Sequence, residues 1–384
     1  MTMGVVDRKN VSKLVNFRHD LHRNPELSGR EKNTADRIVK FMKDYKPDHI
    51  ITGIGGNGCA FVYKGKQKGP VVVFRADMDA LPIREKSELN YSSKKENVAH
   101  MCGHDGHMVT LAGVGVYLCK QRPQKGTIIL LYQPSEETGQ GAKRIIKDEL
   151  FKNYAPDYIF SFHNIPGYEK NEIVLKKGNF SAASVGMSIK LQGISSHAAH
   201  PEKGISPVVL ISEIIDKFET LNNYDEKNFR FGTIVGVNVG EKSFGTMPEK
   251  GVLHATLRAR TDKNLDKMKN IIKEFVDKKA RKRELEYKIE WKEEFKSIKN
   301  SVKAYKILKK AIQNKKLKYT KRQYSFRWSE DFGEYSKYFD SCFFGLGIGE
   351  NAKNLHNPYY FFPDEIIETG IAIYISILKQ LKLI

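Results

Sequence analysis

Three apolar runs in the first half of the chain, each followed by polar residues, restrict the fold more than any other feature. The runs cover residues 69–76, 127–132 and 158–162, and helix-like stretches at 108–120 and 141–148 lie between them. Alternating strands and helices are typical of an α/β domain with a largely parallel sheet. In open sheets of this kind, ligands bind outside the carboxyl ends of the strands. We therefore expect a functional site at that edge.

The residues at these strand ends are suited to chemistry. Asp77 and Asp79 follow the first run, Glu136 and Glu137 follow the second, and His163 ends the third. Because parallel strands end at the same edge of a sheet, these side chains should lie close together. The pattern predicts a cluster of carboxylates and imidazoles.

The segment HMCGHDGH at residues 100–107 adds a thiol to the candidates. Cys102 and His104 are two residues apart and can face one ion, with cysteine bound as thiolate and histidine as neutral imidazole. Such a pair alone is more often structural. His163 and His356 are likewise weak candidates one by one, and their significance comes from the set.

The adjacent carboxylates of QPSEE, residues 133–137, cannot both point to one spot. One can bind a metal while its neighbour moves a proton. Alternatively, the segment starts a helix, with Ser135 as its cap and acidic residues in its first turn. The two interpretations are compatible.

The length of 384 residues predicts two domains. From residue 185 the expected order of elements is βαββαβ, the split arrangement of a ferredoxin-like sandwich. The pattern after residue 296 returns to alternating helix and strand. We expect one discontinuous α/β domain, residues 1–184 and 296–384, and an inserted domain, residues 185–295.

Charge and cysteine content bear on partners and compartment. Lysine and arginine outnumber acidic residues 65 to 45, which could indicate a nucleic-acid partner, but they are scattered, which favours a solvated lysine face. No window approaches the length of a membrane span, and the start lacks the apolar core of a signal peptide. The four cysteines do not form a disulfide pattern, which favours a reducing compartment. Together these features predict a cytoplasmic protein that binds neither nucleic acid nor membrane.

Three of the four cysteines, Cys59, Cys119 and Cys342, are expected to contribute to packing.

Seven motifs occur in the same order as in the M20 family of metallopeptidases and amidohydrolases, and the chain resembles that family over nearly its full length. The resemblance is to the M20D-type branch of hippurate hydrolases, indoleacetyl-amino-acid hydrolases and N-acetyl-diaminopimelate deacetylases. The motifs are RHDLHRNPELSGRE (18–31), FRADMDALP (74–82), HMCGHDGH (100–107), QPSEE (133–137), SSHAAHP (195–201), SEDFG (329–333) and LHNPYYFFPDE (355–365).

The resemblance implies a phosphorylase/hydrolase-like catalytic domain that binds two metal ions. It implies Glu136 as general base and Asp79 as a supporting residue behind the ligands. The thiolate and imidazoles favour manganese, zinc, cobalt or nickel over magnesium. The implied ligands are Cys102, whose thiolate would join the two ions, His104, Glu137, His163 and His356.

The same resemblance implies that the inserted domain is a lid through which two chains form a homodimer. His197 on this domain would stabilise the developing oxyanion, across the interface or on closure. Arg258 would bind a substrate carboxylate, although an ordinary strand arginine facing solvent is an equal alternative. Related enzymes usually carry asparagine where this chain has Gly245, so substrate recognition is expected to differ.

The expected function is a metal-dependent amidohydrolase that removes the acyl group from an N-acyl amino acid. A carboxypeptidase or dipeptidase using the same ions is the nearer alternative. A basic, nucleic-acid-associated protein with a vestigial site is a remote one.

Overall fold

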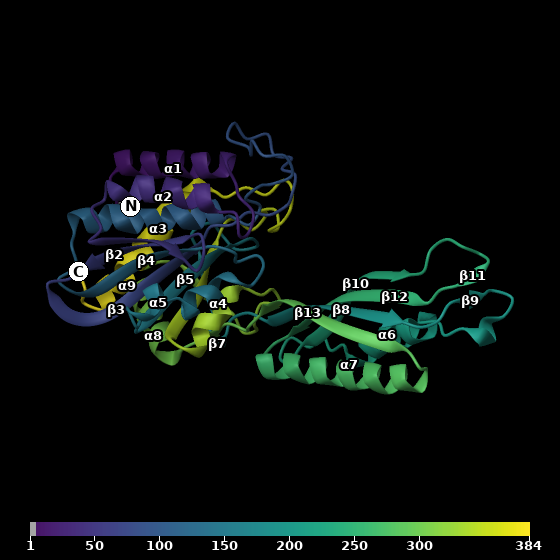
Figure 1. Cartoon of the computed structure of the whole chain (residues 1–384). Helices are drawn as coiled ribbons and strands as arrows, with labels where there is room; N and C mark the ends of the chain where they lie inside the picture. Colours follow the sequence, from purple (N-terminus) through teal and green to yellow (C-terminus); the bar gives the residue numbers. More distant parts are fainter. Residues whose placement is uncertain (1–4) are drawn as a thin grey trace. The chain divides into compact units, whose positions relative to one another are not determined.

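The computed structural model describes residues 5–384, which form two compact units (Figure 1). Unit 1 contains the residues up to Phe180, Ile298–Gln323 and Glu330–Ile384. In Figure 1 it therefore includes both the purple N-terminal helices and the yellow C-terminal helix. Unit 2 contains Ser181–Ser297 and the short segment Tyr324–Ser329. The chain thus leaves unit 1 after Phe180 and returns to it near residue 298.

Unit 1 is built on an eight-stranded sheet with the order β1-β2-β4-β3-β5-β16-β6-β15. The neighbours β4, β3, β5 and β16 run parallel to one another. The expected α/β fold with a mixed, mostly parallel sheet is therefore confirmed. The strands are β1 (His49–Ile54), β2 (Gly58–Lys64), β3 (Gln67–Asp77), β4 (Lys125–Gln133), β5 (Tyr158–Ile165), β6 (Ile173–Leu175), β15 (Tyr319–Lys321) and β16 (Asp340–Gly347), and a separate pair is formed by β7 (Gly178–Asn179) and β14 (Lys299–Asn300).

The helices of unit 1 begin where local caps and packing allow. α1 begins at Arg8, where Asp7 caps it by accepting a hydrogen bond from the Asn10 N–H at 2.9 Å. α3 begins at His104 rather than at Met108, which puts a candidate metal ligand on its first turn. The helices are α1 (Arg8–Arg23), α2 (Lys32–Lys43), α3 (His104–Lys120), α4 (Gly141–Lys147), α5 (Glu149–Lys152), α8 (Val302–Asn314) and α9 (Ile367–Gln380), with 3₁₀ turns η2 (Asp331–Lys337) and η3 (Asp364–Ile366).

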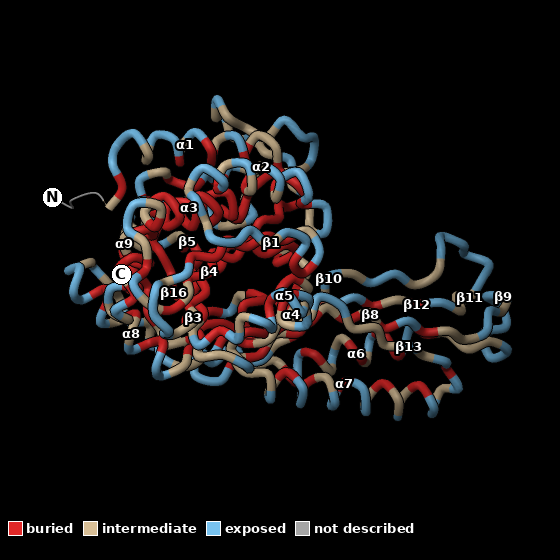
Figure 2. The backbone as a smooth tube through the Cα atoms, turned by 60° about the vertical axis from the view of Figure 1, so that its left-hand side comes forward, coloured by how far each residue is buried: buried red, intermediate tan, exposed pale blue. Residues whose placement is uncertain are grey.

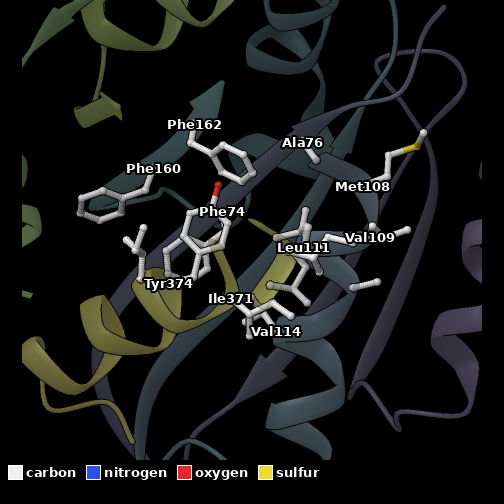
Figure 3. Close-up of a cluster of buried hydrophobic side chains, with 14 of the residues drawn as sticks. Phe74, Ala76, Met108, Val109, Leu111, Val114, Phe160, Phe162, Ile371 and Tyr374 are labelled. Carbon is white, nitrogen blue, oxygen red and sulfur yellow. The ribbon is translucent and has the colours of Figure 1, made fainter. Parts of the chain in front are cut away.

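Helix α3 is buried on almost all sides, unlike a surface helix with one apolar stripe (Figure 2). Its Leu111 lies in a cluster with Phe74 of β3, Phe162 of β5 and Tyr374 of α9 (Figure 3). A Cβ at Gly113 would lie 2.2 Å from Ile371 Cδ1, so glycine leaves room for this side chain of α9 against α3. The packing fixes the start of α3 beside the ends of β3 and β5.

Unit 2 has the element order β8, α6, β10, β12, α7, β13. Its four strands pair antiparallel in the order β10-β12-β8-β13, and α6 and α7 share an apolar core with the sheet. The elements are β8 (Ala183–Gln192), α6 (Val208–Leu221), β10 (Arg230–Val239), β12 (Lys250–Ala259), α7 (Asp262–Lys282) and β13 (Glu286–Phe295), with a small pair β9 (Ser196–His197) and β11 (Thr246–Met247) and the 3₁₀ turn η1 (Pro201–Lys203).

Among residues 5–384, no helix is both long enough and apolar enough to cross a membrane.

Candidate metal centre

The carboxyl edge of the parallel strands gathers the side chains that the sequence singled out in the first domain. Cys102, His104 and His163 form one group whose potential ligand atoms all lie within 4.8 Å of one another, and Cys102, Glu137 and His356 form a second. The Cys102 thiol belongs to both groups. One sulfur atom therefore lies within 4.8 Å of the donor atoms of both groups.

Hydrogen bonds orient the two buried imidazoles toward this centre. His104 Nδ1 donates to the backbone oxygen of Asp79 at 2.8 Å, and His163 Nδ1 donates to the backbone oxygen of Asn164 at 2.8 Å. Each ring thus presents Nε2 to the cluster. His163 Nε2 lies 3.4 Å from Cys102 Sγ, whereas His104 Nε2 is 3.7 Å from Glu137 Oε1. Such bonds on the distal nitrogen are typical of histidines that bind metals.

The cluster carries polar atoms that the protein alone does not satisfy. His104 Nε2 and Glu137 Oε1 are buried without a hydrogen-bond partner. Burial raises the pKa of the Cys102 thiol well above its usual range, and the Glu137 and Glu136 carboxylates raise it further. Burial also raises the pKa of Glu137 to about 7. Because a cation would favour the ionised form of each group, the donor set fits divalent transition-metal ions.

Glu136 and Glu137 differ in their hydrogen-bond partners, although one carboxylate oxygen of each and a ring nitrogen of His104 lie within 4.8 Å of one another. The segment after β4 is a turn rather than a helix start, since α4 begins only at Gly141. Glu136 Oε1 accepts a hydrogen bond from the backbone N–H of Asp331 at 3.3 Å. Burial raises the pKa of Glu136 well above its usual range, and the Glu330 carboxylate adds to this effect. A carboxylate with a raised pKa is suited to accept a proton near neutral pH.

Asp79 lies behind the cluster and holds its backbone. Its Oδ1 accepts from the Glu136 N–H at 3.1 Å, and its Oδ2 accepts from the Glu137 N–H at 2.9 Å. Its own backbone oxygen is the acceptor that orients His104. Asp79 therefore contacts both glutamates and one histidine of the cluster.

The sequence predicted Asp77 only as one of the carboxylates at the strand ends, and His107 only as a structural residue or one behind the metal ligands. His107 Nδ1 lies 2.6 Å from Asp77 Oδ1, and its Nε2 lies 2.6 Å from Asn164 Oδ1. Asp77 Oδ2 is also 3.6 Å from His104 Nε2. His104 and His107 share one face of the first turn of α3, because residues at i and i+3 do so, but the apolar pattern indicated a helix only from residue 108.

Arg75 joins the carboxylates at this edge. Its guanidinium is buried and donates to Asp77 at 2.9 Å, Glu330 at 2.9 Å and Asp331 at 2.8 Å. Its Nε also donates to Gln133 Oε1 at the end of β4 at 3.0 Å. One cation therefore ties β3, β4 and the motif SEDFG together next to Glu136.

Two predicted residues lie in unit 2, whereas the cluster belongs to unit 1. His197 is exposed on β9, and its Nδ1 accepts from the Ala199 N–H at 3.0 Å. Arg258 is half-buried on β12 and donates to Ser329 Oγ at 3.1 Å and to the Arg327 backbone oxygen at 3.2 Å. A side chain at Gly245 would meet no atom within 4 Å.

Comparison with known proteins relates the whole chain to amide-cleaving hydrolases. The model of peptidase family M20/M25/M40 matches residues 73–380. A hippurate hydrolase of Campylobacter jejuni is 32% identical over 95% of this chain and 96% of its own length. An IAA-amino acid hydrolase of Arabidopsis thaliana is 29% identical over 96% of this chain and 84% of its own length. A dinuclear metal-binding M20 peptidase of Bacillus subtilis has the same fold, with a TM-score of 0.84, 24% identity and coverage of 98% of this chain and 100% of that chain.

Replacing Arg75 tests whether this cation stabilises the buried carboxylates. Arg75→Leu should lower the free energy of unfolding by about 3–5 kcal/mol, because it leaves buried carboxylates without their partner. Equilibrium urea denaturation measures the change. Arg281→Leu is the control: its ion pair with Asp277 is exposed on α7, and its loss should cost less than about 1 kcal/mol. Equal losses in the two variants would contradict the assigned role.

Proposed function

The chain belongs to peptidase family M20/M25/M40, and from this membership we propose that it is a metal-dependent amidohydrolase acting on N-acyl amino acids. The family shows that it is a hydrolase of amide bonds. The observation that carries the finer proposal is the Cys102 thiol shared by two groups of donors, with a further carboxylate, Glu136, close to His104 and Glu137.

We propose that the five side chains of the cluster hold two divalent ions. Cys102 would bind both, and manganese, zinc, cobalt or nickel would suit the mixture of thiolate, imidazole and carboxylate. Bound there, such ions would supply Lewis acidity and lower the pKa of a water molecule toward neutrality. The ligands in this proposal are Cys102, His104, Glu137, His163 and His356.

Glu136 would act as the general base. Its carboxylate takes the proton of the attacking water and then delivers it to the leaving nitrogen of the amide. The Asp331 N–H holds one of its oxygens, and burial favours its protonated form, so the proton can be kept between the two steps. Asp79 supports the reaction by fixing the backbone of both glutamates.

Variants of the two glutamates should separate proton transfer from metal binding. Glu136→Gln should lower kcat by at least about 100-fold while leaving the metal content near two ions per chain, because it removes the base and no ligand. Glu137→Gln should lower the metal content, because it removes a ligand. Elemental analysis and steady-state kinetics of both variants measure these effects. Loss of both ions from Glu136→Gln would show that the two roles are exchanged.

The relatives favour N-acyl amino acids over peptides as substrates. One is named a hippurate hydrolase and another, from Bacillus subtilis, an N-acetylcysteine deacetylase, which is 30% identical over 66% of this chain and 67% of its own length. We expect N-acetyl and N-benzoyl amino acids to be cleaved with a higher kcat/KM than dipeptides. A panel of both classes, assayed with manganese, zinc, cobalt and nickel in turn, decides this. Faster cleavage of dipeptides would favour the carboxypeptidase or dipeptidase alternative.

We propose that unit 2 is a ferredoxin-like lid and that two copies of the chain pair through it. Its βαββαβ order and antiparallel sheet support the first part. The edge strand β10 supports the second, because Val235 and Val237 are 64% and 45% exposed there, and an open apolar edge is a template for pairing with another strand. His197 would stabilise the oxyanion, and Arg258 would bind the substrate carboxylate.

His197→Ala tests whether His197 stabilises the oxyanion without contributing to metal binding. It should lower kcat by about 100- to 1,000-fold, as removal of an oxyanion donor does, and leave the metal content unchanged. If His197 acts across a dimer interface, mixing this variant with Glu136→Gln should restore activity, because a mixed dimer contains one site with both groups intact. Action within one chain would leave the mixture inactive. Full activity of His197→Ala alone would remove the residue from the mechanism.

A further inference from the structure

The first motif of the chain ends in a loop, Ser28–Glu31, which has no role in the proposed reaction. Glu31 is fully buried, although it carries a charge and occupies the N-cap position of α2. Charged side chains are almost never fully buried unless they have partners. The partners of Glu31 therefore indicate what the loop does.

The Glu31 carboxylate binds the turn that carries the two catalytic-site glutamates. Its Oε1 accepts from the Ser135 N–H at 2.8 Å and from the Gly29 N–H at 2.8 Å. Its Oε2 accepts from Asn57 Nδ2 at 3.1 Å. Hydrogen bonds from backbone N–H groups to a carboxylate are among the stronger ones in proteins. Glu31 thus connects the N-terminal segment directly to the residue before Glu136.

Ser135 needs such a connection because its backbone is in the left-handed region. Its φ is 57°, a conformation that residues other than glycine adopt only when their surroundings impose it. The reversal at Ser135 directs the chain from the end of β4 into the turn. On its other side, the Ser135 backbone oxygen accepts from the Gln140 and Gly141 N–H groups at 3.2 and 3.0 Å.

Two carboxylates together hold three successive N–H groups. Glu31 accepts from Ser135, and Asp79 accepts from Glu136 and Glu137. The same loop reaches the second carboxylate as well, because Ser28 Oγ donates to Asp79 Oδ2 at 2.6 Å. The direction in which each glutamate leaves the backbone is therefore fixed from one side by this loop.

We propose that Glu31 is a positioning residue, which holds Ser135 in its left-handed conformation so that Glu136 faces the substrate while Glu137 faces the metal ions. This inference rests on the proposed function for the roles of the two glutamates. Glu31 itself touches neither substrate nor metal. Loss of its contact with Ser135 would let the turn relax and would misplace both carboxylates.

Glu31→Ala should lower kcat by about 10- to 100-fold, the range expected for a small misplacement of a catalytic group, with little change in KM. Glu31→Gln should keep most of the activity, because its one amide oxygen can still accept from both Ser135 and Gly29. Glu31→Asp keeps the charge but is too short to reach Ser135, so it should behave like alanine. The aspartate variant decides the question if the alanine variant does not fold.

The matched control is Glu26→Ala in the same motif. Glu26 is also a buried carboxylate, and it accepts from the Thr34 N–H at 2.7 Å and from Asn33 Nδ2 at 2.6 Å at the start of α2. The side-chain hydrogen bonds of Glu26 come from Asn33 and Thr34 and do not reach the turn at residues 133–137. Glu26→Ala should therefore lower the unfolding midpoint and leave kcat unchanged.

A second readout does not depend on activity. Amide hydrogen exchange of the peptide that contains Ser135 should accelerate in Glu31→Ala and Glu31→Asp, but not in Glu31→Gln or Glu26→Ala. Unchanged exchange, or accelerated exchange with an unchanged kcat, would overturn the proposal. If the unmodified protein cleaves no N-acyl amino acid or peptide, the proposed function fails by itself, and the exchange measurement still shows whether Glu31 holds the turn.

Discussion

The buried guanidinium of Arg75 is the interaction on which the arrangement of the candidate site depends. Asp77, Glu330 and Asp331 are all buried, and without a cation among them their mutual repulsion and lost hydration would oppose folding at this edge. Arg75 contacts all three and also Gln133. It therefore joins the end of β3, the end of β4 and the returning C-terminal segment in one place.

The contacts of Arg75 also affect the side chains proposed to react or to bind metal. Asp331, held by Arg75, presents its backbone N–H to Glu136, and Asp77, held by Arg75, lies beside His107 and His104. The carboxylate that would accept the proton is thus held through this cation, and a second carboxylate that the cation binds lies beside the histidine that would bind metal. Stability and chemistry share these contacts, as is common at buried polar networks.

Two non-glycine residues at this edge have a left-handed backbone conformation. Ser135 and His356 have φ angles of 57° and 65°, although neither is glycine. Ser135 is held by Glu31 and by the turn, and the His356 N–H donates to the Met101 backbone oxygen at 2.8 Å. Strained residues of this kind persist only where the surrounding structure imposes them, and they cluster at functional sites. Both lie next to or within the proposed ligand set.

The sequence by itself determined the parallel strands β3, β4 and β5 and the candidate residues at their ends, because runs of apolar residues mark buried strands and the polar residues that follow mark where they end. The motifs added Cys102 and His356 through their family resemblance. The antiparallel strands β1 and β2 lie outside the elements that the apolar pattern predicted. Only the tertiary structure decided that Arg75 pairs with Glu330, 255 residues away, and that Glu31 holds Ser135, 104 residues away. Local patterns carry no information on such contacts, since they arise only when packing brings distant segments to the same edge of the sheet.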